Sequence, residues 1–230
     1  MPYNVSVIFL FAAIIITMIA QAKVNSNFRR YSKVRNNKGI TGAEAARTVL
    51  DANGLNDVRI EKINGNLTDH YDPRKRVLRL SQSVYGVNSV AAVSVACHEA
   101  GHAIQHATSY APLKIRNSIV PIVNIASSLS WILIIVGIGL LYTNYYMGDL
   151  LFNIGVIAFV TVIAFHAITL PVEFDASRRA LKQMEMQNII DEEEDRGAKK
   201  VLGAAAMTYV ASLTVAIANL LRILALRGRD

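Results

Sequence analysis

The segment CHEAGH at residues 97–102 contains two histidines four positions apart, with a glutamate directly after the first. In a helix, residues four apart lie on one face, about 6 Å apart along the axis, so the imidazoles of His98 and His102 can bind one zinc ion. The carboxylate of Glu99 then lies where it can take a proton from a zinc-bound water, whose pKa the metal lowers to about 7. We interpret the segment as the centre of a hydrolytic site that holds one Zn²⁺ per chain.

A catalytic zinc site needs a third protein ligand and an open fourth position. His106 lies eight residues beyond His98, about 12 Å along a straight helix, and cannot reach the same ion. His70 lies in a polar turn that is typical of a protein surface. Glu173 closes a long apolar segment. We choose Glu173, because a carboxylate at that end of a membrane span lies on the same side as the motif helix.

Further groups near Glu173 are candidates to stabilise the oxyanion of the transition state. His166 precedes Glu173 by seven residues, so both project from nearly the same face of one helix. An ionisable residue in a membrane span is a functional candidate, and the alternative for His166 is a neutral ring bonded to a neighbouring helix. Arg178 and Arg179 compete for the role, with membrane anchoring as their alternative. Cys97 is expected to be buried and to point away from the metal.

The elements that must position these residues include four apolar segments without a charged residue. A membrane-spanning helix needs roughly 20 mostly apolar residues, and 53% of the 230 residues are hydrophobic. The four segments are 5–22, 119–142, 150–172 and 201–221. We interpret the first as a retained anchor, because it lacks the positive start of a signal peptide. The last is either a full span or a re-entrant or interfacial helix.

The charge distribution predicts how these spans are oriented. Residues 23–116 carry 15 basic and 7 acidic residues, whereas residues 143–149 contain no Lys or Arg. The positive-inside rule therefore places the long segment in the cytoplasm and the short connection outside. The net charge of +7 then indicates contact with anionic lipid rather than with nucleic acid. Three arginines after the last segment do not fit if that segment spans: Arg222, Arg227 and Arg229.

Capping and turn residues predict the elements between the first two spans. Thr41 with Glu44 three residues later predicts the start of a helix that Gly54 ends. Residues 58–63 and 77–80 are expected to be strands, and the second, VLRL, is expected to be an edge strand that holds an extended substrate. Asn88 or Ser89 is expected to cap the motif helix, from Val90 to about Ala107. The acidic run in residues 189–200 is interpreted as an exposed turn or helix face.

Together these features predict a mainly α, multi-pass protein of the cell membrane, whose small zincin-like α+β cytoplasmic domain carries the HExxH helix. The expected parts are an anchor (1–22), the zincin-like domain (23–118), two membrane helices (119–172), a cytoplasmic segment with the third ligand (173–200), and a fourth helix with the tail (201–230). The single cysteine excludes a disulfide framework.

Three segments of the chain resemble the YugP-type neutral zinc metallopeptidases of bacterial membranes. They are HEAGHAIQH (98–106), PVEFDASRRAL (171–181) and NGNLTDHYDP (64–73). The resemblance extends over nearly the whole chain, including the placement of the apolar segments. It implies a gluzincin-like site, in which His98, His102 and Glu173 bind zinc and Glu99 is the base.

More distantly, the arrangement is similar to that of the HtpX and Ste24 membrane proteases. In those proteins an aspartate four positions after the ligand glutamate supports a histidine ligand. Here Ser177 stands at that position, and Asp175 lies two residues earlier. The resemblance leaves two candidates for this support, Asp175 and Ser177.

The expected function is that of a zinc-dependent metalloendopeptidase, in which Glu99 assists the attack of a zinc-bound water on a peptide bond. Its partners are then peptides or proteins, membrane proteins among them, and the lipid bilayer. The alternative is a catalytically silent membrane scaffold with a structural zinc ion. The two differ in coordination, because a structural zinc site has four protein ligands and a catalytic one keeps a position open.

Overall fold

The computed structural model of the 230-residue chain describes residues 3–227. Its elements are α1 (Tyr3–Tyr31), α2 (Gly42–Ala52), β1 (Arg59–Ile63), β2 (His70–Asp72), β3 (Val77–Ser81), α3 (Val90–Ala107), α4 (Ala111–Leu140), α5 (Tyr145–Met186) and α6 (Glu192–Arg227). They form two compact units. The helical unit comprises the described residues up to Ile19, Ile115–Leu170 and those from Thr208 onward. The mixed unit comprises Ala20–Lys114 and Pro171–Met207.

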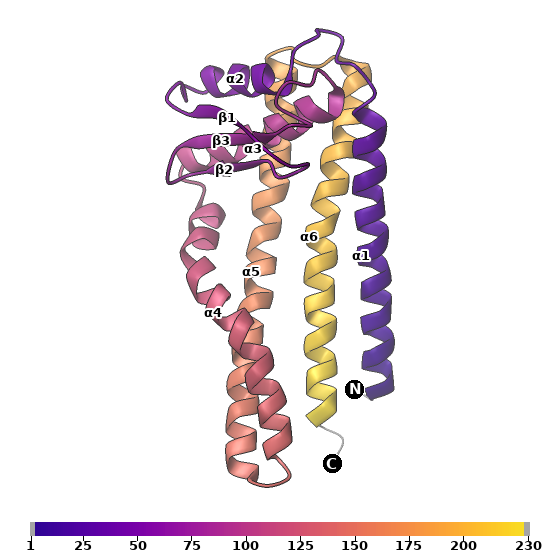
Figure 1. Ribbon diagram of the computed structural model, residues 1–230, viewed down its shortest axis with the longest axis vertical. Coiled ribbons are helices and arrows are strands. Elements are labelled where there is room, and N and C mark those ends of the chain that lie inside the picture. The colour runs from indigo at the N-terminus through magenta and orange to yellow at the C-terminus, as the bar shows by residue number, and fades with distance from the viewer. Residues whose placement is uncertain (1–2, 228–230) are drawn as a thin grey trace. The chain divides into compact units, whose positions relative to one another are not determined.

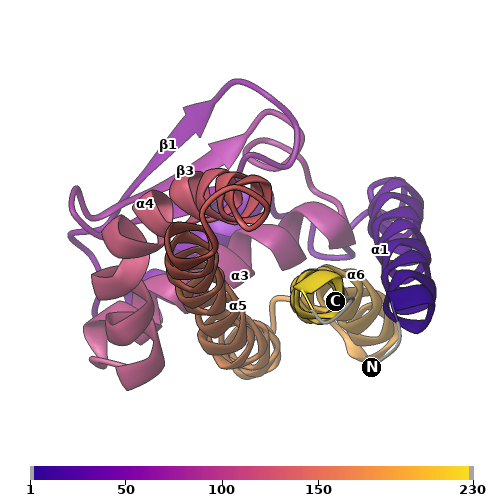
Figure 2. The same cartoon turned by 90° about the horizontal axis from the view of Figure 1, so that it is seen from below.

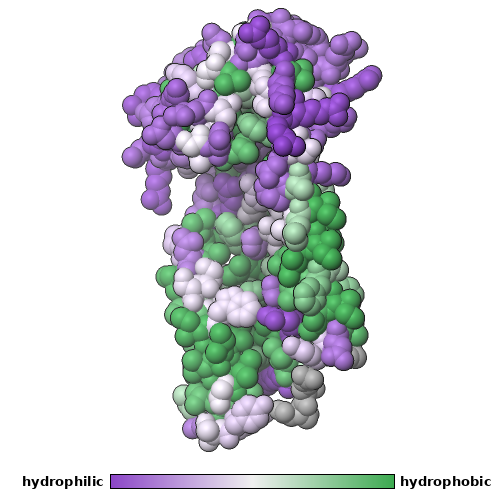
Figure 3. Space-filling model, turned by 45° about the vertical axis from the view of Figure 1, so that its right-hand side comes forward, coloured by the Kyte–Doolittle hydropathy of each residue, from purple (hydrophilic) through white to green (hydrophobic). Residues whose placement is uncertain are grey.

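Four helices are long and apolar enough to cross a membrane, judged by length and composition: α1, α4, α5 and α6. Each predicted apolar segment falls on one of them, except that α4 ends two residues before the end of segment 119–142. Large apolar side chains on the surface of these helices are exposed: Ile8 by 67%, Ile135 by 65% and Ile157 by 68%. Figure 3 shows hydrophobic side chains along the helices. Such a surface is suited to lipid rather than water. The predicted fold class, mainly helical with a small sheet, is confirmed.

Glycines set the packing of α4 against α5 in the helical unit (Figure 1; Figure 2). A Cβ atom at Gly137 would lie 2.6 Å from the backbone nitrogen of Phe152, and one at Gly155 would lie 2.8 Å from the Ile134 side chain. Small residues allow membrane helices to approach this closely. Phe152 and Ile134 are both buried in the core of the unit.

Polar contacts join the end of α6 to the start of α5. Arg227 donates hydrogen bonds to Asn153 Oδ1 (2.7 Å) and Asp149 Oδ1 (2.6 Å), and its guanidinium lies over the Phe152 ring. The far end of α6 therefore lies at the end of the helical unit where α5 begins. Arg229 lies outside the described residues.

The mixed unit contains a three-stranded sheet in the order β1-β3-β2, with β1 parallel and β2 antiparallel to β3 (Figure 1). The prediction that VLRL forms a substrate-binding edge is wrong, because β3 is the central strand. Val77 pairs with both Arg59 of β1 and Asp72 of β2, so both sides of β3 are occupied. The edges of the sheet are β1 and β2.

The predicted caps of the two helices in this unit are confirmed. Thr41 caps α2 in a reciprocal capping box with Glu44, and Gly54 follows the helix with a φ of +71°. Ser89, rather than Asn88, caps α3 through a hydrogen bond from the Ala92 N–H. Residues of β3 and of helices α2, α3, α5 and α6 share one apolar core.

The acidic run at the start of α6 is only partly exposed. Asp191 caps the helix by accepting hydrogen bonds from the N–H groups of Glu193 and Glu194. Glu194 is buried and accepts a hydrogen bond of 2.7 Å from the backbone N–H of Asn37. The interpretation of the whole run as an exposed face is therefore wrong at Glu194, because its carboxylate joins α6 to the segment after α1.

Candidate metal site

His98 and His102 on α3 meet Glu173 on α5, and their candidate ligand atoms all lie within 4.8 Å of one another. Glu173 Oε2 is 3.2 Å from His98 Nε2 and 3.6 Å from His102 Nε2. Tetrahedral zinc with bonds of about 2.0–2.1 Å places its ligand atoms about 3.3 Å apart. The donor set is the one expected for a catalytic zinc ion, and the two separations from Glu173 are close to this value. The three side chains are largely shielded from solvent.

Gly101 of the motif allows α3 to come close enough to α5 for Glu173 to join the histidines. A Cβ atom at this position would lie 2.6 Å from the backbone oxygen of Ala176. Ala176 follows Glu173 by three residues, so the close approach and the third ligand lie within one turn of α5. The glycine between the two motif histidines thus has a packing reason to be there.

The three groups influence one another's charge. Burial favours the neutral imidazole of His102, but the hydrogen bond to Glu173 and the charges of Glu99 and Glu173 raise its pKa overall. Burial likewise favours the protonated form of Glu173, but hydrogen bonds from His102 and His98 hold the pKa of this carboxyl well below its usual range. Glu173 is therefore ionised at neutral pH, as a carboxylate ligand must be.

The ligand histidines have different partners on their Nδ1 atoms. His98 Nδ1 lies 3.1 Å from the hydroxyl of Ser177. His102 Nδ1 lies 3.0 Å from Gln105 Oε1, and Gln105 Nε2 donates to Asp175 Oδ2 at 2.9 Å. The structure thus places Ser177 next to His98 and connects Asp175 to His102 through Gln105.

Gln105, Arg178 and Arg179 all donate hydrogen bonds to the carboxylate of Asp175. Gln105 is fully buried. It lies three residues after His102, and nothing in the sequence distinguishes it from a polar residue on the exposed face of a helix. Both candidate transition-state arginines are therefore engaged by the Asp175 carboxylate.

The remaining candidates have other surroundings. Glu99 is buried next to His98 on α3, and Cys97 belongs to the apolar core, where burial raises the pKa of its thiol. His106 Nδ1 lies 2.9 Å from the Tyr71 hydroxyl. His70 is exposed, and neither it nor His106 belongs to the metal-binding group. His166 lies on the part of α5 in the helical unit, where its ring packs against Phe165.

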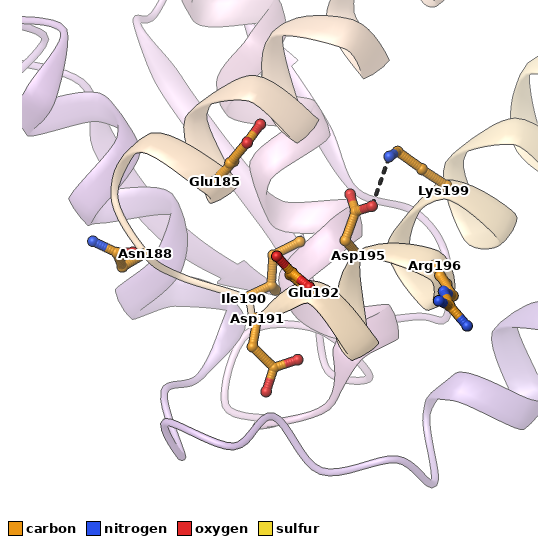
Figure 4. A pocket seen from close by; sticks show the side chains of 8 residues that line it. All are labelled: Glu185, Asn188, Ile190, Asp191, Glu192, Asp195, Arg196 and Lys199. Carbon is orange, nitrogen blue, oxygen red and sulfur yellow. Dashed lines mark ion pairs between the residues drawn. The ribbon is translucent and has the colours of Figure 1, made fainter.

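A cavity of about 680 Å³ lies at the start of α6, where four acidic residues contribute to its lining (Figure 4): Glu185, Asp191, Glu192 and Asp195. Asp195 is paired with Lys199 across 2.6 Å. Within residues 3–227, no three of the acidic groups here satisfy the spacing of a shared metal ion. The cavity therefore adds no second metal centre to the described part of the chain.

Comparison with known proteins agrees with this geometry. The sequence model of a family described as "Putative neutral zinc metallopeptidase" matches residues 6–228. The "Putative membrane protease YugP" of Bacillus subtilis (strain 168) is 48% identical over 221 residues, which cover 95% of this chain and 96% of that protein. No solved structure shows a significant match.

Proposed function

The chain belongs to this family of neutral zinc metallopeptidases, and on that basis we propose that it is a membrane zinc metalloendopeptidase with its active site at His98, His102 and Glu173. The observation that carries the proposal is the donor set. Two histidines on one helix turn and a glutamate from another helix converge, with Glu99 buried next to them. Three protein ligands leave a fourth position open, as hydrolysis requires.

The alternative, a silent scaffold with a structural zinc ion, requires a fourth protein ligand. Within residues 3–227, no fourth His, Cys, Asp or Glu joins the group. Cys97, the neighbour in sequence, lies in the apolar core and keeps its proton because burial raises its pKa. The coordination thus favours the catalytic interpretation.

In the proposed mechanism each residue has a distinct task. His98, His102 and Glu173 would hold the zinc ion, which when bound supplies Lewis acidity to water and to a peptide carbonyl. Glu99 takes the proton from the attacking water and then gives it to the leaving amine nitrogen. Ser177 and Asp175 hold the rings of the two histidines, the second through Gln105.

We further propose that the mixed unit, with its excess of basic residues, faces the cytoplasm. The four long apolar helices support a multi-pass arrangement in the cell membrane. The contacts of Arg227 with Asp149 and Asn153 support a complete crossing by α6, since the short connection and the end of α6 then share one side. Substrates are proteins or peptides, membrane proteins among them.

The mechanism is tested by substitutions in the purified full-length chain. Glu99→Gln is expected to retain zinc and to lose hydrolysis of an unfolded reporter protein by at least about 100-fold, the typical contribution of a general base. Glu173→Ala is expected to lose zinc. Glu192→Gln and His70→Ala, at exposed positions, are the matched controls and should retain both. Hydrolysis by Glu99→Gln at the wild-type rate, or full zinc occupancy in Glu173→Ala, would contradict the proposal.

A further inference from the structure

We propose that Gln105 is a positioning residue, which fixes the tautomer of His102 so that Nε2 faces the metal with its lone pair free. The proposal rests on the metal site proposed above and assigns a role to a residue that does not contact the metal. The structure supports it through the hydrogen bonds of a single fully buried amide.

The orientation of the Gln105 amide follows from its partners. Nε2 lies 2.8 Å from the backbone oxygen of Val172 and 2.9 Å from the carboxylate of Asp175. A carbonyl oxygen only accepts hydrogen bonds, and so does an ionised carboxylate. The NH₂ group must therefore face these two acceptors, and both of its hydrogens are used.

The orientation of the amide determines the protonation of the neighbouring imidazole. Because Nε2 donates to these two acceptors, Gln105 presents its oxygen to His102 Nδ1 at 3.0 Å. An amide oxygen cannot donate, so Nδ1 must carry the hydrogen. In the neutral ring the lone pair is then on Nε2, the atom that lies 3.6 Å from Glu173 Oε2.

Hydrogen bonds from two arginines fix the Asp175 carboxylate, and this in turn restrains rotation of the Gln105 amide. Arg178 and Arg179 donate hydrogen bonds to the two carboxylate oxygens of Asp175. The Arg179 guanidinium also lies 5.5 Å from the centre of the Tyr110 ring. A continuous set of contacts therefore extends from the surface arginines to His102.

His98 is restrained by a different kind of group. Its Nδ1 faces the Ser177 hydroxyl, which donates or accepts by rotating one hydrogen. A hydroxyl is compatible with either tautomer, whereas the Gln105 amide is compatible with only one. We infer that the two ligand histidines are not equivalent, and that the geometry of His102 is the more strongly determined.

The test measures zinc affinity by chelator competition in the full-length, detergent-purified chain, a readout that needs no turnover. Gln105→Met keeps the volume of the side chain and removes its polar atoms. We expect its zinc dissociation constant to rise about 10–100-fold, the usual effect of losing a partner behind a metal ligand. Ser94→Ala is the matched control, because Ser94 is also polar and fully buried on α3, but its hydroxyl donates to the Val90 carbonyl of its own helix. It should keep the wild-type dissociation constant.

A polarity reversal separates positioning from packing. Gln105→Glu combined with Asp175→Asn keeps an acceptor for His102 Nδ1 and a donor–acceptor pair between positions 105 and 175, so its zinc affinity should recover toward the wild-type value and exceed that of Gln105→Met. The melting temperature of each metal-free variant monitors folding. Equal dissociation constants for Gln105→Met and Ser94→Ala, or no recovery in the double variant, would overturn the proposal.

The outcome is independent of the proposed enzymatic activity. If the wild-type chain binds zinc but cleaves nothing, the proposed function fails while the affinity ratio of Gln105→Met still decides the role of Gln105. If the wild-type chain cleaves protein and Gln105→Met binds zinc normally, only the role of Gln105 fails. A wild-type chain without affinity for zinc would overturn both.

Discussion

Single residues in this protein are placed by packing as much as by chemistry, and Gly101 is the clearest example. It lies between two proposed ligands, and its missing side chain allows the backbone of Ala176 to approach. The same close approach brings Glu173 to the histidines. A position that carries no reactive group thus determines whether the donor atoms meet.

We predict that Gly101→Ala destabilises the chain by about 1–3 kcal/mol, the usual cost of overpacking, and lowers its zinc occupancy. The added Cβ would lie 2.6 Å from a backbone oxygen, and a backbone cannot move aside as a flexible side chain can. Thermal unfolding and metal analysis provide the measurement. Gly203→Ala on α6 is the control, because nothing lies within 4 Å of a Cβ there. Since alanine is the better helix former by about 1 kcal/mol, equal stabilisation of both variants would contradict the prediction.

At this scale the sequence was informative where spacing determines contact. His98 and His102 share a helix face by periodicity alone, and the position of Glu173 at the end of an apolar segment indicates it as the third ligand. Gln105 was missed because burial of a polar helix position depends on which helix packs over it. Glu194 was missed for the same reason, since only the path of the segment after α1 brings the Asn37 N–H to its carboxylate.

Among the elements, α2 shows how local hydrogen bonds determine where a helix begins. The Thr41 N–H donates to Glu44 Oε2 at 2.7 Å, and the Glu44 N–H donates to Thr41 Oγ1 at 3.3 Å. The hydrogen bonds from the Thr41 backbone and then from its hydroxyl lower the pKa of Glu44. The start of α2 is therefore sensitive to acid.

We predict that α2 begins to fray as the pH falls below about 4.3, the ordinary glutamate value. The folded pKa is lower than the unfolded one, so the stabilisation is complete above the unfolded value and is lost as the pH falls through the folded value. Hydrogen exchange of the α2 amides, corrected for the intrinsic rate, measures the effect. Glu44→Gln should remove this pH dependence, whereas Thr41→Ala should cost about 1 kcal/mol of helix stability. Identical pH profiles for wild type and Glu44→Gln would contradict the prediction.

Helices and strands with strong local signals could be predicted from the sequence, but the elements with which they pair could not. The caps at Thr41 and Ser89 specified α2 and α3 within the sequence itself. The strand VLRL was also recognised, but alternation reports only which residues face the core. Whether a strand is central or at an edge depends on pairing partners elsewhere in the chain, here β1 and β2, and that information is not local.

For the whole molecule, the charge pattern and the four apolar helices together imply a specific topology. The basic mixed unit and the uncharged turn between α4 and α5 are expected on opposite sides of the membrane. Cys97 is buried in the core, so the wild-type chain offers no accessible thiol among its described residues. New cysteines can therefore report accessibility without removing the native one.

We predict that Thr143→Cys, in the turn before α5, reacts with a membrane-impermeant maleimide on intact cells. Asn66→Cys, in the connection between β1 and β2, should react only after the membrane is permeabilised. Both positions are exposed, so a difference in labelling reports the side of the membrane. The wild-type chain is the control and should remain unlabelled in both conditions. Labelling of Asn66→Cys on intact cells would reverse the proposed orientation.

The separation of the ligands along the chain has a consequence for biogenesis. Glu173 follows His98 by 75 positions, and the apolar segments of α4 and α5 lie between them. During synthesis the two histidines leave the ribosome first, and the third ligand follows only after two further hydrophobic segments have emerged. A nascent chain therefore holds an incomplete donor set until its third span has been made. On the proposed function, proteolytic competence arises late, when the protein is already committed to the membrane and cannot cleave the cytosolic proteins it meets on the way.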